Sequence, residues 1–321
     1  MKNSPVLIVA KNASQLRTKM QHTAPDETFV VCEELSEAPA LVALHSPEVV
    51  HMLRDTDFSG PEFRAISQMD VVKWVQVSGS GYDFLLPIER SDLLLTNGQG
   101  LRSRDLAEML MGCMISLNNG LHMYRDRQKQ RLWQPHCFRP LAGQTLLLVG
   151  TGLIGTWVAK LAKAFGMHVI GSNRNGRSVE PFDEIIRPDA LEDVLPRCDV
   201  VSLHLRLDDS TRNYFGARQF DLMKEQAIFI NTGRGGLVDE AALVEALQSR
   251  RIRGAYLDVF ETEPLPESSP LWQMDNVLVT PHAADLVENW DYQSAQFFAE
   301  NLLAWRQGLP MQNIVQMGRG T

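Results

Sequence analysis

Three charged or titratable side chains follow apolar segments in the second half of the sequence. Arg234 lies in the glycine-rich stretch INTGRGGLVD, Glu263 in LDVFETEPLP and His282 in VTPHAA. At the carboxyl edge of a parallel sheet, where α/β proteins bind ligands, a guanidinium can bind a carboxylate with two parallel hydrogen bonds. A histidine oriented by a carboxylate is a general acid or base. Taken singly, the three could equally be a surface ion-pair arginine, an exposed glutamate and a capping histidine.

A second group of residues forms the glycine pattern G-x-G-x-x-G. Gly150, Gly152 and Gly155 lie in VGTGLIG, between a predicted strand and a predicted helix. In that setting the first glycine permits a tight turn, the second a close approach of a pyrophosphate, and the third the packing of helix on strand. The first helical turn, which includes Leu153 and Ile154, presents free N–H groups to the phosphates. The pattern predicts a dinucleotide site, with a tight turn that binds no ligand as the alternative.

The stretch HVIGSNRNGR (168–177) follows at the place where a dinucleotide fold ends its second strand. An acidic residue there would accept the ribose hydroxyls of NAD and would repel a 2′-phosphate. This chain has Asn173 there, followed by Arg174 and Arg177, which can donate forked hydrogen bonds to a phosphate dianion. The pattern predicts NADP(H) as the preferred cofactor. NAD(H) stays possible if both arginines are solvated loop charges.

The elements that would position these residues form two series of alternating strands and helices. Such alternation predicts parallel sheets with helices packed on them. In the first series we expect strands at 5–10, 40–44, 73–77 and 92–96, a helix at 62–69, one long helix at 103–127 capped by Ser103, and an irregular loop at 133–143. In the second series we expect strands at 144–150, 168–172, 198–205, 226–231, 252–259 and 276–280, and helices at 153–166, 239–250 and 285–308.

The place of the glycine pattern bears on the number of domains. It begins at Gly150, after a complete α/β section, whereas a nucleotide-binding unit that opened the chain would carry its glycines after the first strand. We therefore expect two α/β domains, with the active site in the cleft between them.

Length and composition restrict the class of protein. The chain has 321 residues, 44% of them hydrophobic and 22% charged, and a formal net charge of -8. An acidic chain without a dominant basic tract argues against a nucleic-acid partner. The basic run at 125–131 is interpreted as a solvated helix end or loop, with a polyanion patch as the alternative. Because no apolar run approaches the ~20 residues that span a bilayer, we expect no membrane partner.

The cysteines carry little chemistry. Cys32, Cys113, Cys137 and Cys198 are too far apart in sequence for a CxxC metal site or a disulfide scaffold. Ordinary buried thiols in a reducing compartment are the favoured interpretation. The first apolar run, residues 5–10, is too short for the core of a signal peptide. We therefore expect no metal site and a cytoplasmic location.

The order of four motifs resembles one known family. GTGLIG, NTGRGGLVDEAALVEAL, RGAYLDVFETEPLP and TPHAA follow one another as in the D-isomer-specific 2-hydroxyacid dehydrogenases, and the resemblance is strong over residues 70–285. It implies two Rossmann-like, doubly wound parallel-sheet domains: a substrate domain at 1–98 and 286–321, and a dinucleotide-binding domain at 99–285. It also implies a homodimer built largely around the nucleotide domain.

The same resemblance implies roles for four residues of the second domain. Arg234, Glu263 and His282 fall on the family's catalytic arginine, glutamate and histidine. Asp258 matches the aspartate that contacts the nicotinamide carboxamide. His282, held by Glu263, would protonate the substrate oxygen during reduction.

The family's substrate loop falls on VQVSGSGYD in the first domain. A small, glycine-containing turn after a strand suits a nest of N–H groups for an anion, although it could also be a plain tight turn. The residues that would bind the substrate carboxylate in this way are Ser78, Gly79, Ser80 and Gly81.

Other positions match the family or depart from it. Thr232 and Gly233 would line the cofactor cleft by the same match. The family usually has a proline where this chain has Arg206, which could approach the 2′-phosphate or the adenine. Trp133 lies in a loop whose tryptophan, in some hydroxypyruvate reductases, reaches the partner's active site; packing within its own loop is the alternative.

The residues and the resemblance together predict an NADP(H)-preferring reductase of small 2-oxo acids, with glyoxylate or hydroxypyruvate as substrate. A phosphoglycerate dehydrogenase or a larger 2-oxoacid reductase using NAD is the alternative within the class, although no basic phosphate pocket can be placed from the sequence. A nucleotide-sensing, corepressor-like binding protein is the alternative of another class. A phosphonate or formate dehydrogenase is disfavoured by the carboxylate-binding loop.

Overall fold

The computed structural model describes residues 3–54 and 58–315 and divides into two compact units. Unit 1 is Met1–Leu101 with Val287–Thr321, and unit 2 is Arg102–Leu286. The boundaries predicted from the sequence are 98/99 and 285/286. The predicted substrate domain includes residues 1–2, 55–57 and 316–321, which lie outside the described residues.

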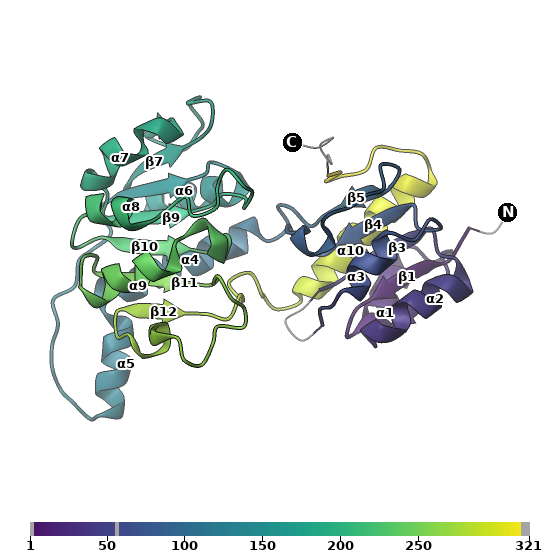
Figure 1. Cartoon of the computed structure of the whole chain (residues 1–321), viewed down its shortest axis with the longest axis horizontal. Helices are drawn as coiled ribbons and strands as arrows, with labels where there is room; N and C mark the ends of the chain where they lie inside the picture. Colours follow the sequence, from purple (N-terminus) through teal and green to yellow (C-terminus); the bar gives the residue numbers. More distant parts are fainter. Residues whose placement is uncertain (1–2, 55–57, 316–321) are drawn as a thin grey trace. The chain divides into compact units, whose positions relative to one another are not determined.

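Unit 1 is a five-stranded parallel sheet with the order β2-β1-β3-β4-β5 (Figure 1). This is a doubly wound order. Strand β2 is added on one side of β1 and strands β3 to β5 on the other, so the order in which strands are added reverses between β1 and β3. Buried strand residues face two cores, one with α2 and α3 and the other with α1 and α10. The bounds are β1 Val6–Val9, α1 Ala13–Thr23, β2 Phe29–Cys32, α2 Ala38–His45, β3 Val49–Met52, α3 Glu62–Ser67, β4 Trp74–Val77, β5 Leu94–Thr96 and α10 Trp290–Arg306.

Unit 2 is a seven-stranded parallel sheet with the order β12-β11-β10-β9-β6-β7-β8 (Figure 1). Its reversal between β6 and β9 is the one that dinucleotide-binding folds use. Helices α4 and α6 pack on one face, and α7, α8 and α9 on the other. The bounds are α4 Ser103–Asn119, α5 Leu121–Lys129, β6 Thr145–Val149, α6 Leu153–Ala164, β7 His168–Ser172, β8 Glu184–Ile186, α7 Leu191–Val194, β9 Val200–Leu203, α8 Ala217–Leu222, β10 Ile228–Asn231, α9 Glu240–Gln248, β11 Gly254–Leu257 and β12 Val277–Val279.

The predicted fold class is confirmed, but one of the strands predicted for the first domain is a helix in the structure. Residues 40–44 belong to helix α2, with Pro39 in its first turn and a left-handed Ser46 as its C-cap. A five-residue apolar run does not distinguish a strand from a buried helix, and a proline at a helix start favours the helix. The strands that complete this sheet, β2 and β3, were not expected from the sequence.

The first helices of unit 2 and the last helix of the chain, α10 of unit 1, also differ from expectation. The long helix predicted at 103–127 is two helices, α4 and α5, separated by Gly120 with φ 66°. The N-cap of α4 is Arg102 rather than Ser103. The last helix, predicted from residue 285, begins at Trp290. The basic run at 125–131 lies on the exposed α5 and the turn after it.

The thiols are all free, and three of them are buried as expected. Burial raises the pKa of Cys32 and of Cys113 to about 11, and that of Cys198 to about 12. The expectation of a buried thiol is wrong for Cys137, which is exposed in the loop after α5. No helix among the described residues is long and apolar enough to cross a bilayer.

One buried histidine makes the stability of unit 1 depend on pH. His51 on β3 stacks on Phe298, with 4.7 Å between ring centroids, and burial lowers its pKa to about 3. The unfolded chain takes up a proton near pH 6.5 while the folded chain does not, so stability falls by about 1.4 kcal/mol per pH unit below that pH. Urea unfolding at pH 7 and pH 5 should show that the His51→Leu variant loses about 2 kcal/mol less than wild type.

The matched control for this prediction is His45, which is exposed in the last turn of α2. The His45→Gln variant should keep the pH dependence of wild type. If the His51→Leu variant also keeps it, a different group is responsible for the acid sensitivity.

Candidate active site

The glycine pattern lies at the carboxyl end of β6, where the sheet of unit 2 reverses. Gly150 has φ 116°, and a Cβ there would lie 2.6 Å from the His204 carbonyl oxygen. A Cβ at Gly155 would lie 2.2 Å from the Gly150 carbonyl oxygen, so the helix approaches the strand closely only because both residues are glycine. A Cβ at Gly152 would meet open space, which leaves room for a ligand above the first turn of α6.

The carboxyl end of β7 carries the residues expected at the ribose. Asn173 Nδ2 donates to Thr151 Oγ1 at 3.3 Å and to the Arg177 carbonyl oxygen at 3.0 Å. Asn173 Oδ1 is buried and has no hydrogen-bond partner among the described residues. Arg174 and Arg177 are exposed on the turn that follows. The structure therefore places an unsatisfied acceptor beside two arginines.

The turn after β10 holds Arg234 in an extended conformation, with φ -147° and ψ 144°. Asn231 fixes this turn, because its Oδ1 accepts from Gly233 N at 3.1 Å and its Nδ2 donates to the Arg234 carbonyl oxygen at 3.0 Å. Arg234 Nη1 donates to the Gly233 carbonyl oxygen at 2.8 Å. Thr232 Oγ1 is buried and has no partner among the described residues. Sequence reasoning missed the positioning role of Asn231, which only the turn geometry reveals.

Glu263 and His282, which are 19 positions apart in sequence, form a hydrogen-bonded pair in unit 2. His282 Nδ1 lies 2.7 Å from Glu263 Oε2, and the second carboxylate oxygen accepts from Phe260 N at 3.0 Å. Burial alone raises the pKa of Glu263. The hydrogen bond and charge of His282, the Phe260 N–H and the charge of Arg234 outweigh it and hold that pKa below its ordinary value. With Nδ1 bound to a carboxylate, the Nε2 position of the imidazole is left for a substrate.

The segment that carries His282 is fixed by Asp258, a buried residue after β11. Asp258 Oδ1 accepts from Ala283 N at 2.8 Å, from Ala284 N at 3.1 Å and from the Thr280 hydroxyl. His282 N also donates to the Asp258 carbonyl oxygen at 2.8 Å. These bonds hold His282 at φ 52°, a left-handed conformation that costs free energy in a non-glycine residue. Asp258 thus positions the histidine in addition to any contact with a cofactor.

The loop predicted to bind a carboxylate lies in unit 1, after β4. Its carbonyl groups are fixed, since the Gly79 oxygen accepts from Gly98 N and the Ser80 oxygen from Asn97 Nδ2, both at 2.8 Å. Within the described part of the chain, the N–H groups of residues 79–81 donate to no protein atom. Ser78 is different, because it is buried and its N–H donates to the Met52 carbonyl oxygen. Ser78 therefore anchors the loop. Its N–H is already used within the protein, so Ser78 does not contribute an N–H group to the predicted anion nest.

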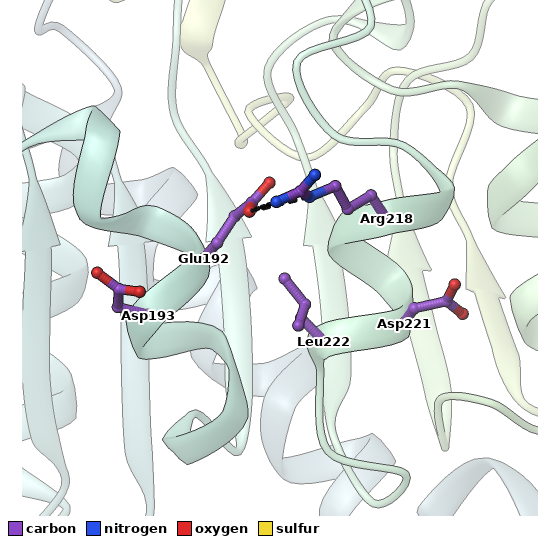
Figure 2. A pocket seen from close by; sticks show the side chains of 5 residues that line it. All are labelled: Glu192, Asp193, Arg218, Asp221 and Leu222. Atoms are coloured by element: carbon purple, nitrogen blue, oxygen red, sulfur yellow. Dashed lines mark hydrogen bonds and ion pairs between the residues drawn. The ribbon is translucent and has the colours of Figure 1, made fainter.

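A hollow of about 520 Å³ on unit 2 lies apart from these residues, between α7 and α8 (Figure 2). Its arginine, Arg218, is already bound by Glu192 Oε2 through two hydrogen bonds of 2.9 and 2.6 Å. Asp193 and Asp221 point away from each other in Figure 2. No group of three or more metal-binding side chains occurs among the described residues, here or elsewhere.

Comparison with known proteins identifies the family. The profile of the "D-isomer specific 2-hydroxyacid dehydrogenase, NAD binding domain" matches residues 111–284, more than half of the chain and all within unit 2. The chain belongs to this family. It is accordingly an NAD(P)-dependent 2-hydroxyacid dehydrogenase, an oxidoreductase that acts on a CH–OH group.

Three similar proteins show how far this match extends. The dehydrogenase is 34% identical over 305 residues to a glyoxylate reductase of Aeropyrum pernix. The aligned region covers 91% of this chain and 86% of that protein. It is 32% identical over 310 residues to a D-3-phosphoglycerate dehydrogenase of Methanocaldococcus jannaschii, covering 91% of this chain but only 58% of that protein. The NADPH-dependent glyoxylate/hydroxypyruvate reductase of Sinorhizobium meliloti, solved with NADP and sulfate, superposes with a TM-score of 0.82 at 26% identity, covering 98% of each chain.

Proposed function

We propose that this dehydrogenase reduces a small 2-oxo acid, glyoxylate or hydroxypyruvate, to the D-2-hydroxy acid with NADPH as preferred cofactor. The observation that carries the proposal is the Glu263–His282 pair, an acid–base couple next to the charge of Arg234. The relatives from Aeropyrum pernix and Sinorhizobium meliloti are named for reactions of this kind, which supports the substrate class.

The residues of unit 2 fit a nicotinamide dinucleotide. The open space at Gly152 and the first-turn N–H groups of α6, from Leu153 to Gly155, suit the pyrophosphate. Two buried acceptors that lack partners, Asn173 Oδ1 and Thr232 Oγ1, would gain hydrogen bonds from such a ligand. By the family match, Thr232, Gly233 and Asp258 would lie toward the nicotinamide.

The chemistry assigned to the remaining residues follows from their charges. The bound cofactor supplies the hydride that adds to the keto carbon. By the family match, Arg234 of unit 2 would bind the substrate carboxylate. The same match assigns carboxylate binding to the free N–H groups of residues 79–81 in unit 1. His282 would give a proton from Nε2 to the substrate oxygen while Glu263 stabilises the charged imidazole, and it would take that proton back in the oxidative direction. Hydride and proton together reduce the carbonyl to the alcohol.

The cofactor preference depends on Arg174 and Arg177. Both are exposed, and the loss of one charge-assisted hydrogen bond to a 2′-phosphate should raise the KM for NADPH by at least about tenfold, because a bond of this kind contributes ~1.5–3 kcal/mol. The KM for NADH, which has no 2′-phosphate, should change little in the Arg174→Ala variant. Initial rates of NADPH and NADH oxidation with glyoxylate and with hydroxypyruvate measure both quantities.

The exposed Arg197, which pairs with Glu184 away from the β7 turn, gives the matched control. The Arg197→Ala variant should keep both KM values. A higher wild-type kcat/KM for NADH than for NADPH would reduce Arg174 and Arg177 to solvated charges. An absence of turnover with either cofactor, despite cofactor binding, would favour the nucleotide-sensing alternative.

We also propose a homodimer, formed through an arm made of α5 and the loop at 130–143. The arm extends beside the sheet of unit 2 in Figure 1, and no side chain of α5 is buried. Its apolar side chains are exposed: Trp133 by 99%, Phe138 by 58% and Leu132 by 50%. Large apolar side chains exposed along one segment favour an interaction site there. Free thiols agree with a reducing compartment, and the cytoplasm remains the proposed location.

The dimer is tested by the mass of the protein in solution at decreasing concentration. The Trp133→Ser variant should dissociate at a concentration at least about tenfold higher than wild type, because an exposed tryptophan at an interface contributes ~1–2 kcal/mol or more. Trp272, 51% exposed outside the arm, provides the control variant Trp272→Ser. A wild-type mass equal to 36.1 kDa at all concentrations would contradict the proposal.

A further inference from the structure

A chain of hydrogen-bonded side chains runs through the interior of unit 2 to the segment that carries His282. The Tyr256 hydroxyl lies 2.9 Å from Thr280 Oγ1, and the Thr280 hydroxyl contacts Asp258 Oδ1. Tyr256 is fully buried on β11, in the core that contains α4 and α6. On its other side the Tyr256 hydroxyl is hydrogen-bonded to the thiol of Cys113 on α4. The proposed function gives no role to Tyr256 or Thr280.

The register of the sheet brings these side chains together. Tyr256 and Asp258 are two residues apart, so their side chains point to the same face of the sheet. Strands β11 and β12 are parallel, with Leu257 opposite Val279, and Thr280 N donates to the Leu257 carbonyl oxygen at 3.0 Å. Thr280 therefore lies beside the end of β11, where its hydroxyl contacts both the tyrosine and the aspartate.

The direction of each hydrogen bond in the chain follows from Asp258. Its Oδ1 accepts from two backbone N–H groups, those of Ala283 and Ala284, so it is an acceptor for the Thr280 hydroxyl as well. A hydroxyl has one proton, and once Thr280 gives it to Asp258, its oxygen accepts from Tyr256. Burial holds the pKa of Tyr256 well above its ordinary value, so the hydroxyl keeps the proton that it donates. Both side chains thus donate toward the carboxylate.

One oxygen of Asp258 is left for a ligand. Oδ1 accepts all three of these bonds, whereas Oδ2 accepts from no group in the described part of the chain. Asp258 is 3% exposed, so a turn of its carboxylate would break these bonds where little water can replace them. By the family match, Asp258 would contact the nicotinamide carboxamide. A hydroxyl that fixes Oδ1 therefore also fixes the direction of Oδ2.

We propose that Thr280, supported by Tyr256, is a positioning residue for the reduction. It holds Asp258 so that Oδ2 is presented to the cofactor and the segment of His282 keeps its left-handed turn. The inference rests on the proposed function and adds to it two residues that act through Asp258. The reaction itself is unchanged, since the hydride adds to the keto carbon and the proton goes from His282 to its oxygen.

The first test measures binding, which does not depend on turnover. It compares whichever of NADPH and NADH wild type binds more tightly with the matching fragment that lacks the nicotinamide, which is ADP-ribose with or without the 2′-phosphate. In the Thr280→Val variant, calorimetric titration should show a Kd for the dinucleotide about two- to tenfold higher, the effect of one weakened hydrogen bond. The Kd for the fragment should stay at the wild-type value, because the fragment does not reach Asp258.

The second test measures turnover of glyoxylate and hydroxypyruvate at saturating cofactor. Thr280→Val should lower kcat by about 10- to 100-fold, approaching the cost of a ~1 Å displacement of a reacting group. The KM for the 2-oxo acid should change less than kcat, because its carboxylate is assigned to Arg234 and the loop in unit 1. Thr280→Ser, which restores the hydroxyl, should recover most of kcat and of the dinucleotide affinity.

The role of Tyr256 is tested by a double-mutant cycle with Thr280. Tyr256→Phe alone should lower kcat by about two- to tenfold, the effect of one lost hydrogen bond. In the Thr280→Val enzyme the same substitution should lower kcat no further, because Tyr256 acts through the Thr280 hydroxyl. Tyr214 packs against the other core of unit 2, and the matched control Tyr214→Phe should keep the wild-type kcat and Kd.

The outcomes separate this inference from the proposed function. Wild-type kcat and Kd in Thr280→Val would overturn it, and so would equal losses of affinity for the dinucleotide and the fragment, which indicate a general distortion of unit 2. Losses that multiply in the double variant would overturn the part assigned to Tyr256. If Thr280→Val does not fold, Tyr256→Phe gives the same comparison of affinities. If no 2-oxo acid is reduced, the proposed function fails, while the two affinities still decide whether Thr280 positions Asp258.

Discussion

The His282→Gln variant should lose about 10²–10⁴-fold in kcat with glyoxylate or hydroxypyruvate, the range that general acid–base catalysis contributes. Its cofactor affinity should stay close to that of wild type, because the imidazole of His282 is hydrogen-bonded to Glu263, which is not assigned to the dinucleotide, and the substitution keeps the backbone N–H that donates to Asp258. The physical reason is the 2.7 Å contact with Glu263, which leaves Nε2 as the proton donor to the substrate oxygen. Stopped-flow reduction under saturating NADPH measures the loss, and cofactor fluorescence measures the binding.

A second variant separates the proton donor from the group that supports it. Glu263→Gln keeps an acceptor near His282 but removes the negative charge that stabilises the protonated imidazole. We expect a smaller loss of kcat than in His282→Gln. As the pH is raised, the rate of reduction should begin to fall at a lower pH in Glu263→Gln than in wild type. Because the pKa of Glu263 is held below its ordinary value, wild type keeps this charge across neutral pH.

The control for this series is the exposed His45 of unit 1. The His45→Gln variant should retain full turnover. If His282→Gln keeps more than a third of the wild-type kcat, a water molecule or another side chain delivers the proton, and the Glu263–His282 pair has a structural role.

The elements that carry these residues could be predicted because each has a local signal. A glycine pattern between an apolar run and a helical segment located β6 and α6, and Asp239, whose side chain accepts from Ala242 N at 3.1 Å, marked the start of α9. The alternation of strands and helices predicted the fold class. These signals depend on neighbours in sequence, which is why a single sequence contains them.

The features that escaped prediction depend on contacts distant in sequence. Residues 40–44 form a helix because Ala38 and Val42 pack into the core of unit 1, which the apolar run does not reveal. The positioning bonds of Asn231 and Asp258 could not be derived, because a buried Asn or Asp at a strand end has no distinctive pattern.

The Gly235→Ala variant should lose both stability and activity, although Gly235 bears no functional group. A Cβ at this position would lie 1.9 Å from both the carbonyl carbon and the oxygen of Phe260, and 2.5 Å from Glu261 N. These are backbone atoms, which cannot rotate away as a flexible side chain can. Overpacking of this kind costs ~1–3 kcal/mol, which for a unit of this size lowers the melting temperature by a few degrees to about 10 °C.

The loss of activity follows from what the clash would move. Phe260 N–H donates to Glu263 Oε1, and Gly235 directly follows Arg234, so one methyl group would push apart the two turns that carry these residues. A displacement of ~1 Å in a catalytic group can cost about 10²-fold in rate. We therefore expect kcat/KM to fall by this order in enzyme that is still folded at the assay temperature.

Gly112 provides the matched control, because it lies inside α4 and a Cβ there meets nothing within 4 Å. Gly112→Ala should raise stability by about 0.5–1 kcal/mol and leave kcat/KM at the wild-type value. Calorimetry should show stability changes of opposite sign in the two variants, and steady-state rates should show a loss of kcat/KM in Gly235→Ala alone. A Gly235→Ala enzyme with wild-type kcat/KM would mean that the two turns move together, and that the relative position of Arg234 and Glu263 tolerates a shift of the backbone between them.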